Sequence, residues 1–576
     1  MILLTDNGAS KYSVILDNLN ASPSEQYAAD ELVSFVRQVT NATLTICNNN
    51  LEQCYDENKI IIVGKNNLTE KLGLDDEINL VGDEGFIIRN IGDIIIIAGG
   101  RLRGTLYGVY EFLETYLGCR WYTPDVNNIP VRDKVELPDM NIKKTPVFSI
   151  REAFDLNNFD GNWSARNKAN GHHHRLMPHH GGGVNYIGVH SFDRLCPPDV
   201  YFDEHPEYFS EVNGRRIKER TQLCLTNPDV LRIVIENVRK TIKENPGCSI
   251  ISVSQNDWDN YCTCEKCRKI DGEEESHMGT VLRFVNAVQE TVTKEYPHVR
   301  IDTLAYTYTR KPPKITKPNP GVLIRLCSIE CCFAHPLYEC HVDRNEMPSN
   351  FLQDIYDWSK VSRDIYVWDY TTDFANYLLP FPNLNVLKRN LEFFRDHGVI
   401  GLFEEGAPNT KLSYAGEMRQ YALAKLMYDL SLDDKLLFDE FYAGVFGPAA
   451  PYVKAFYEFW QEKSLESGEH IFGGDDANHS YHTKENVNTA RNFLNKAMVL
   501  AADEATRTRI EKIALSCDFI DTVQMKKGRE KDAAVDAFIG KCKIMDMENL
   551  TEWHTLEQSA SAYKNQDAAV PREKNH

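Results

Sequence analysis

Ser249-Ile-Ile-Ser-Val-Ser-Gln-Asn-Asp-Trp258 is an apolar run that ends abruptly in polar groups. Its first five residues are apolar or small, and three of them are apolar and β-branched, which is typical of a buried strand. An amide (Asn256), a carboxylate (Asp257) and an aromatic ring (Trp258) follow. Polar groups directly after an apolar strand are typical of the catalytic end of a parallel strand. The segment therefore predicts a barrel strand that presents Asn256 and Asp257 to an active site.

Strand and helix patterns alternate between residues 144 and 411. Most of the apolar strand patterns are followed by an amphipathic helical pattern, and together they predict a (β/α)8 TIM-like barrel. The second and third strand patterns are the weakest. The long segment between the first two, which contains His172–His174 and His179–His180, predicts a flexible loop, with substrate contact as a second interpretation. The eight expected strands are 147–153, 186–190, 222–225, 249–254, 300–306, 322–329, 364–368 and 400–403.

Two further regions flank the barrel. Residues 1–143 mix strand and helix patterns, including a helix over 25–40 that Ser22 would cap, and predict a small α/β domain with helices on one face of a sheet. Residues 412–576 carry five helical patterns, over 411–430, 434–446, 449–467, 483–503 and 505–525, and predict a helical C-terminal domain. The fold class is thus α/β, with three domains at 1–143, 144–411 and 412–576.

Size and charge limit the classes of function. The chain has 576 residues, which predicts more than one domain, and its apolar and charged fractions, 42% and 26%, are those of an ordinary soluble protein. A net charge of −20 argues against a general nucleic-acid binder, which needs a basic face. We expect no membrane span, because no apolar run approaches ~20 residues. Residues 1–6 lack a signal-peptide pattern, which predicts an intracellular protein or a chain without its leader.

Carboxylates follow four of the expected strands, at Asp257, Glu330, Asp369 and Glu405. One such acid alone is as often a loop cap or a solvated rim group as a catalytic group. Agreement among four strand ends favours a site. Paired carboxylates with stacking aromatic rings are typical of glycoside hydrolysis, whereas no Gly-x-Ser-x-Gly or phosphate-binding loop occurs in the barrel region. Substrate contacts are expected from His190, Trp258, Tyr306, Trp368 and Asp369.

A cysteine cluster follows Asp257. Cys262, Cys264 and Cys267 place three thiols within six residues, which predicts a structural zinc site with a fourth ligand from elsewhere, or a disulfide. Either would stiffen the loop after Asp257. We expect catalysis itself to need no cofactor.

Several motifs resemble known families. The segment 103–124 is similar to the end of the small domain that precedes the barrel in family 20 hexosaminidases and family 67 α-glucuronidases. His205-Pro-Glu-Tyr-Phe-Ser210, Gln222-Leu-Cys-Leu-Thr-Asn-Pro228, Ser254-Gln-Asn-Asp-Trp258 with its cysteines, and Trp368-Asp-Tyr with Pro380-Phe-Pro-Asn383 resemble the domain of unknown function 4838. That domain corresponds to glycoside hydrolase family 163. The resemblance covers about residues 10–415.

The resemblance implies an endo-β-N-acetylglucosaminidase that cuts the chitobiose core of N-glycans, with a glycan or glycoprotein as substrate and a secreted, periplasmic or cell-surface location. Related barrels use the substrate's own 2-acetamido group as nucleophile. In our hypothesis Asn256 holds the acetamide group and Asp257 acts as the acid. The rival assignment makes Glu330 the acid or stabiliser and Glu405 its partner.

Two other classes of protein stay open. An exo-acting hexosaminidase or an α-glucuronidase-like enzyme is the first, and the latter would need a basic clamp for a uronate. Arg151 and Arg325 are the strand-borne candidates for that clamp. A catalytically inactive carbohydrate-binding protein is the second.

Overall fold

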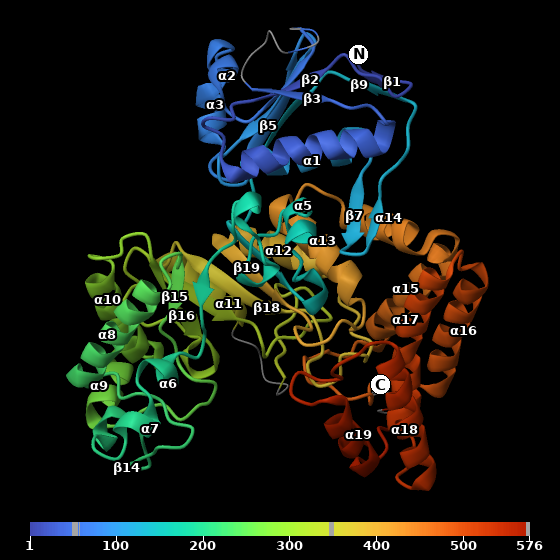
Figure 1. Ribbon diagram of the computed structural model, residues 1–576. Helices are drawn as coiled ribbons and strands as arrows, with labels where there is room; N and C mark the ends of the chain where they lie inside the picture. The colour runs from blue at the N-terminus through green and yellow to red at the C-terminus, as the bar shows by residue number, and fades with distance from the viewer. Residues whose placement is uncertain (49–53, 55, 57, 345–350, 572–576) are drawn as a thin grey trace.

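The computed structural model describes residues 1–48, 54, 56, 58–344 and 351–571 (Figure 1). An N-terminal α/β unit lies at the top of Figure 1, a curled sheet with its helices at lower left, and a group of C-terminal helices at lower right. The α/β class, the barrel-like centre, the small N-terminal unit and the helical C-terminal region are as expected. The domain limits at 143 and 411 stay a prediction. No helix in the described ranges is long and apolar enough to cross a membrane.

The central sheet is parallel and has seven strands in the order β11-β19-β18-β17-β16-β15-β12. Its first strand in sequence, β11, pairs with its last, β19, which curls the sheet into a half-barrel. Among the described residues no pairing joins β11 to β12, so the barrel is open between them. The strands are β11 (Ile150–Phe154), β12 (Tyr186–Ile187), β15 (Ile250–Ser252), β16 (Arg300–Ala305), β17 (Val322–Cys327), β18 (Ile365–Tyr370) and β19 (Val399–Glu405).

A principal helix on the outside of the sheet precedes each of four strands, β15, β16, β18 and β19 (Figure 1). Their apolar stripes pack on strands that are buried on both faces, so the strands are nearly continuous apolar runs. The principal helices are α8 (Pro228–Glu244), α10 (Met278–Val292), α11 (Phe351–Val361) and α12 (Leu387–Asp396), with α9 (Glu265–Glu274) in the loop after β15.

The prediction of a third barrel strand at 222–225 is wrong. Leu223 makes only an isolated bridge with Phe209, outside the sheet. The physical reason lies in its neighbours: the Gln222 side chain donates to the carbonyl oxygens of Asn256 and Trp258 at 2.9 and 2.6 Å, and the buried thiol of Cys224 faces the cysteines of the next loop. The segment therefore braces the loop after β15 instead of extending the sheet.

The N-terminal unit is built on a six-stranded sheet in the order β10-β5-β6-β4-β2-β3. Ser22 caps α1 with a full capping box, as expected. Helices cover both faces, not one: α1 and α4 pack on one side and α3 on the other. Its strands are β2 (Ser13–Leu16), β3 (Thr45–Asn48), β4 (Ile60–Val63), β5 (Phe86–Ile91), β6 (Ile94–Gly99) and β10 (Asn141–Lys144), and its helices are α1 (Pro23–Thr40), α2 (Asn67–Lys71), α3 (Asp75–Leu80) and α4 (Gly104–Phe112).

The C-terminal region contains all five expected helices and two more, α18 and α19. The helix α13 is buried almost all round because it lies between the barrel sheet and the other helices. The loop between α18 and α19 returns to the mouth of the barrel, where the backbone N–H of Glu552 donates to the carbonyl of Phe374 at 2.9 Å. The helices are α13 (Gly416–Tyr428), α14 (Asp434–Phe446), α15 (Ala450–Ser467), α16 (Lys484–Leu500), α17 (Glu504–Val523), α18 (Arg529–Ile544) and α19 (Leu556–Asn565).

A buried ion cluster joins the N-terminal unit to the barrel. Arg151 of β11 is fully buried and donates to both carboxylate oxygens of Glu84, at 2.9 and 3.0 Å. Arg103 donates to the same carboxylate at 2.5 Å. Burial alone would raise the pKa of Glu84, but the two guanidinium groups lower it to about 2. Arg151, expected to contact substrate, is thus used in this junction.

Replacing Arg151 by Met leaves the Glu84 carboxylate buried with one cation, so we expect a loss of about 3–5 kcal/mol of stability at pH 7. The depressed pKa means that the pair stabilises the fold above pH ~4.5 and ceases to do so as pH falls through about 2. The difference from wild type, followed by denaturant unfolding across this range, should therefore shrink in acid. Glu236→Gln, which removes an exposed pair with Arg232, is the control and should leave unfolding unchanged. Equal effects of the two variants would contradict the prediction.

Candidate active site

A pocket opens at the carboxyl ends of the barrel strands. Its volume is about 840 Å³, within the range of small-molecule sites. The strand ends supply most of its walls, and the α18–α19 loop closes one side. The polar and aromatic residues that line it include Glu152, Phe154, His172, His173, Tyr186, His190, Asp257, Tyr306, Arg325, Arg344, Trp368, Tyr370, Phe403, Glu405, Glu552 and Trp553.

Alternation along the strands decides which side chains enter the pocket. On β18, Trp368 and Tyr370 line it, so Asp369 between them points to the other face of the sheet. There the Ser328 hydroxyl donates to Asp369 at 2.6 Å, and burial raises the pKa of Asp369 to about 6. Its register partner on β19 is Glu404, which also points away from the pocket. Asp369 therefore has no direct access to a ligand in the pocket.

Glu405, the last residue of β19, is a buried carboxyl group inside the pocket. Only 6% of its surface is exposed, and the indole N–H of Trp368 donates to it at 2.6 Å. Burial, reinforced by the charge of Glu552, raises the pKa of Glu405 to about 8, against the lowering effects of Trp368 and Arg325. The group is therefore protonated over much of the neutral range, as a proton donor must be.

Asp257 lines the same pocket from the loop after β15 and has an exposed side chain. The Tyr306 hydroxyl donates to it at 3.0 Å, and His190 Nε2 lies 3.9 Å from the same oxygen. His190 Nδ1 donates to the carbonyl of Gln255 at 2.9 Å, which orients the ring. His190 also has a φ of 50°, a left-handed conformation that costs a non-glycine residue about 1 kcal/mol and marks the loop as tightly specified.

Asn256 and Trp258 flank Asp257 but do not line the pocket in the described part of the chain. The Asn256 amide donates to Asp193 at 2.6 Å and to the carbonyl of Thr221 at 2.9 Å. The Trp258 indole donates to the carbonyl of Thr221 at 2.7 Å. Both residues therefore fix the loop that presents Asp257, and neither offers its polar group to a ligand.

Glu330 is also placed elsewhere. It follows the end of β17 and pairs with Arg310 at 2.7 Å, and Arg310 bonds Asp354 at 2.8 Å as well. The described residues that line the pocket do not include Glu330. Of the four carboxylate or amide groups expected to be catalytic, the structure brings together Asp257 and Glu405 and leaves Asn256 and Glu330 outside.

Sequence reasoning missed two carboxylates of the pocket. Glu152 accepts from His173 Nδ1 at 2.5 Å and from the backbone N–H groups of His172 and His173, and these contacts lower its pKa to about 2 despite its burial. Glu152 lies two residues before Phe154 on β11, and side chains two apart on a strand face the same way. This spacing is the signal in the sequence that could have identified it. Glu552 lies in the helical tail, where no local pattern marks it. Burial and the charge of Asp257 raise the pKa of Glu552.

Arg325 forms part of the pocket floor. Its guanidinium lies 4.3–4.9 Å from the centres of four aromatic rings, those of Tyr186, Tyr366, Trp368 and Phe403. Only 2% of the residue is exposed. It therefore acts on Glu405 mainly through its positive charge, which lowers the pKa of that carboxyl group, and less as a hydrogen-bond donor to a ligand.

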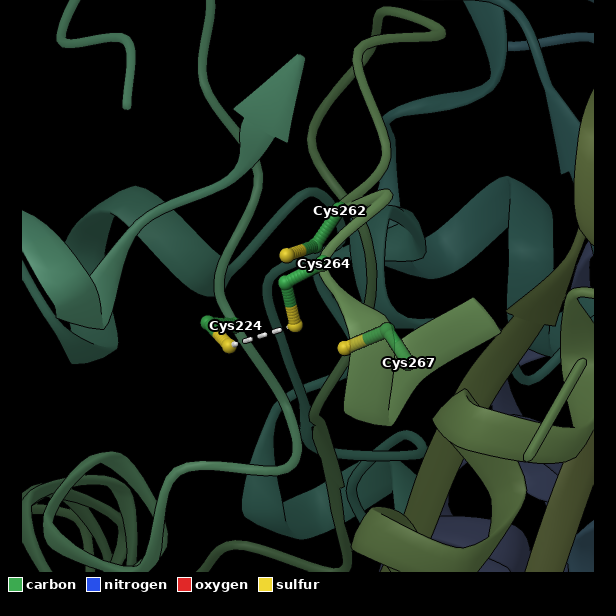
Figure 2. A group of neighbouring side chains, drawn as sticks. All are labelled: Cys224, Cys262, Cys264 and Cys267. Atoms are coloured by element: carbon green, nitrogen blue, oxygen red, sulfur yellow. Dashed lines mark hydrogen bonds between the residues drawn. The ribbon is translucent and has the colours of Figure 1, made fainter. Parts of the chain in front are cut away.

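The cysteine cluster is complete in the structure. Figure 2 shows the sulfurs of Cys262, Cys264 and Cys267 turned toward that of Cys224, which is the fourth group expected from elsewhere. All four residues are buried. Cys224 and Cys264 Sγ lie 3.8 Å apart, and tetrahedral zinc–thiolate bonds of ~2.3 Å give the same sulfur–sulfur spacing of roughly 3.8 Å. The donor set therefore fits a closed structural metal site.

Comparisons with known proteins agree with this architecture. A family model described as a domain of unknown function (DUF4838) matches residues 121–458, and one described as the N-terminus of glycosyl hydrolase family 67 matches residues 5–112. No curated protein matches the chain. A solved family GH115 4-O-methyl-α-glucuronidase with specificity for decorated arabinogalactans is similar at TM-score 0.58 and 12% identity, over 100% of this chain and 82% of that one. A GH138 enzyme targeting pectin rhamnogalacturonan II has a TM-score of 0.49 and 9% identity, over 96% and 98% of the two chains. The similarity to the GH115 enzyme shows that the fold is glycoside hydrolase-like.

Replacing Trp368 by Phe removes the indole N–H that favours the charged form of Glu405. We expect the pKa of Glu405 to rise above its value of about 8 by roughly one pH unit. Carboxyl-carbon NMR of glutamate-labelled protein measures this, with Glu405→Gln to assign the signal. Trp358→Phe is the matched control, because it removes an indole N–H outside the pocket, donated to the carbonyl of Arg310, and should leave the titration of Glu405 unchanged. A pKa that stays or falls in Trp368→Phe would be inconsistent with this arrangement.

Proposed function

The chain belongs to the family described as a domain of unknown function (DUF4838), and we propose that it is a glycoside hydrolase that cuts the chitobiose core of N-glycans. The observation that carries the proposal of hydrolysis is Glu405, a buried carboxyl with a pKa of about 8 beside further carboxylates in a barrel-end pocket. The finer activity, endo-β-N-acetylglucosaminidase action, is supported by the resemblance of the motifs at 205–228, 254–267 and 368–383 to glycoside hydrolase family 163.

In this proposal Glu405 is the general acid. Burial keeps its proton at neutral pH, and the indole N–H of Trp368 holds the carboxyl in place. The proton passes to the glycosidic oxygen as the bond from that oxygen to the anomeric carbon breaks. This assignment differs from the one based on sequence, which gave the acid role to Asp257.

Asp257 is then the group that orients the substrate's 2-acetamido group, in place of Asn256. Its carboxylate accepts the acetamide N–H, while the acetamide oxygen attacks the anomeric carbon and forms a cyclic oxazolinium intermediate. The negative charge of Asp257 stabilises the positive charge that develops on the nitrogen. Glu405, now a carboxylate, removes a proton from the water that opens the ring. Tyr306 holds Asp257, and the rings of Tyr306 and Trp368 are placed to stack on sugar faces.

The cluster Cys224/Cys262/Cys264/Cys267 is proposed to bind a structural zinc ion. Cys262 and Cys264 belong to the loop after Asp257, and Cys267 lies in the first turn of α9, so the ion would hold this loop and helix against the segment that carries Cys224. The ion would have no part in the chemical steps.

An α-glucuronidase-like exo-enzyme is the second candidate. One observation favours it: Arg344 and the nearly buried Arg325 are among the residues that line the pocket, and a uronate needs a cationic partner. Separate incubations with a complex N-glycoprotein and with a uronate-decorated polysaccharide distinguish the candidates. Release of an intact glycan supports the endo-enzyme, release of a uronic acid from a decorated polysaccharide supports the exo-enzyme, and a bound but unchanged glycan indicates a binding protein.

We expect Glu405→Gln to lower turnover of a natural N-glycan by ~10²–10⁴, because the leaving oxygen loses its proton donor. A substrate with a good leaving group needs less protonation, so its turnover should fall much less. Asp257→Asn should slow both substrates, and Glu330→Gln, outside the pocket, should slow neither. Wild-type activity should decline as pH rises through about 8. Near-normal turnover of the natural glycan by Glu405→Gln would refute the acid assignment.

The same variant should also be more stable. The folded-state pKa of Glu405 is raised from 4.5 to about 8, so its ionisation opposes folding increasingly as pH rises between these values. Glutamine has the shape but not the charge. At pH 7 we expect Glu405→Gln to gain on the order of 3 kcal/mol over wild type, with no gain at pH 4, where both groups are neutral. Melting temperatures at the two pH values measure this, and a gain that is the same at both would contradict the prediction.

A further inference from the structure

Two cysteines and two histidines from distant parts of the chain converge beside the pocket. Cys332, His335 and Cys340 lie in the loop after β17, and His470 follows α15. One donor atom from each lies within 4.8 Å of the other three. Cys332 is buried and the other three residues are half-buried. This group shares no residue with the cysteine cluster of Figure 2.

The spacing of the donor atoms matches that around a single ion. Cys332 Sγ lies 3.3 Å from His335 Nδ1, and Cys340 Sγ lies 3.5 Å from His470 Nδ1. A tetrahedral zinc ion with Zn–S of ~2.3 Å and Zn–N of ~2.0–2.1 Å separates its sulfur and nitrogen ligands by roughly 3.5 Å. Both thiols are free, so the pair of cysteines is not used in a disulfide.

We propose that Cys332, His335, Cys340 and His470 bind a zinc ion in a closed, four-coordinate structural site. Two thiolates and two imidazoles are a donor set typical of zinc. Magnesium and calcium take oxygen ligands instead. Four protein ligands leave no open position for water, so the site does not supply a catalytic hydroxide.

The ion would tie two walls of the pocket together. Phe333, next to Cys332, donates its backbone N–H to the carbonyl of Ile471, next to His470, at 2.8 Å. Gly473 and Gly474 follow and line the pocket, as does Arg344 in the loop after β17. A side chain at Gly474 would begin 3.1 Å from the Arg344 guanidinium, so the two segments touch at the pocket wall.

Zinc content of the purified full-length chain tests the site. We expect His470→Ala and Cys332→Ser each to lose one zinc ion per chain relative to wild type. His341→Ala is the matched control, because His341 adjoins Cys340 but is exposed and outside the cluster, and it should lose none. Cys264→Ser should lose the ion of the other cluster and keep this one. An unchanged zinc content in His470→Ala, or a Cys332–Cys340 disulfide in the native protein, would overturn the proposal.

Zinc-edge X-ray absorption identifies the ligands without relying on a destabilising variant. In Cys264→Ser the remaining zinc should have two sulfur and two nitrogen ligands. If that variant does not fold, the wild-type spectrum decides: nitrogen ligands should be present with both sites filled, whereas sulfur alone would exclude the second site. These results are independent of the proposed glycosidase activity, because metal content does not depend on turnover.

Discussion

The parallel pairing of β11 with β19 brings the first and last strands of the barrel sheet side by side. Its register sets Glu152 opposite Phe403 and Phe154 opposite Glu405. Because side chains alternate, Glu152 and Glu405 both point into the pocket while Arg151 and Glu404 point away from it. A slip of β11 by one residue would turn Glu152 away from the pocket and Arg151 toward it, while Glu405 stayed in place. The buried cluster of Arg151, Arg103 and Glu84 lies on the reverse side of β11, so the same strand fixes the pocket and the N-terminal unit.

Two buried carboxyl groups of this pocket have pKa values that are shifted in opposite directions. Glu152 is surrounded by donors from His172 and His173, which hold it charged. Glu405 has one donor and a second carboxylate nearby, so burial dominates and holds it neutral. Burial is common to both groups, so the hydrogen bonds and the neighbouring charges around each carboxyl group decide the outcome. A pocket with one fixed anion and one proton donor is suited to acid-assisted bond cleavage.

The sequence predicted the sheet far better than the site. Apolar runs such as 322–327 and 399–403 are unmistakable strands, and Ser22 with Glu25 marks the start of α1. Assigning Asp369 together with Trp368 to the pocket was inconsistent with alternation, since neighbours on a strand cannot face the same way. Asn256 was misplaced because nothing local reveals that Asp193 and Thr221 bind its amide. Glu552 was missed because only the tertiary fold brings the helical tail back to the barrel.

The return of that tail has a consequence for biosynthesis. The pocket includes residues from Glu152 to Trp553, so its last wall comes from a segment that the ribosome makes long after the barrel strands. Domains generally fold in order of synthesis, and the barrel sheet is complete at Glu405. A nascent chain thus carries Glu405 without the neighbouring Glu552 that helps to raise its pKa. The part of the raised pKa of Glu405 that depends on Glu552 is therefore acquired only after the segment around residue 552 has been made, well after the barrel sheet.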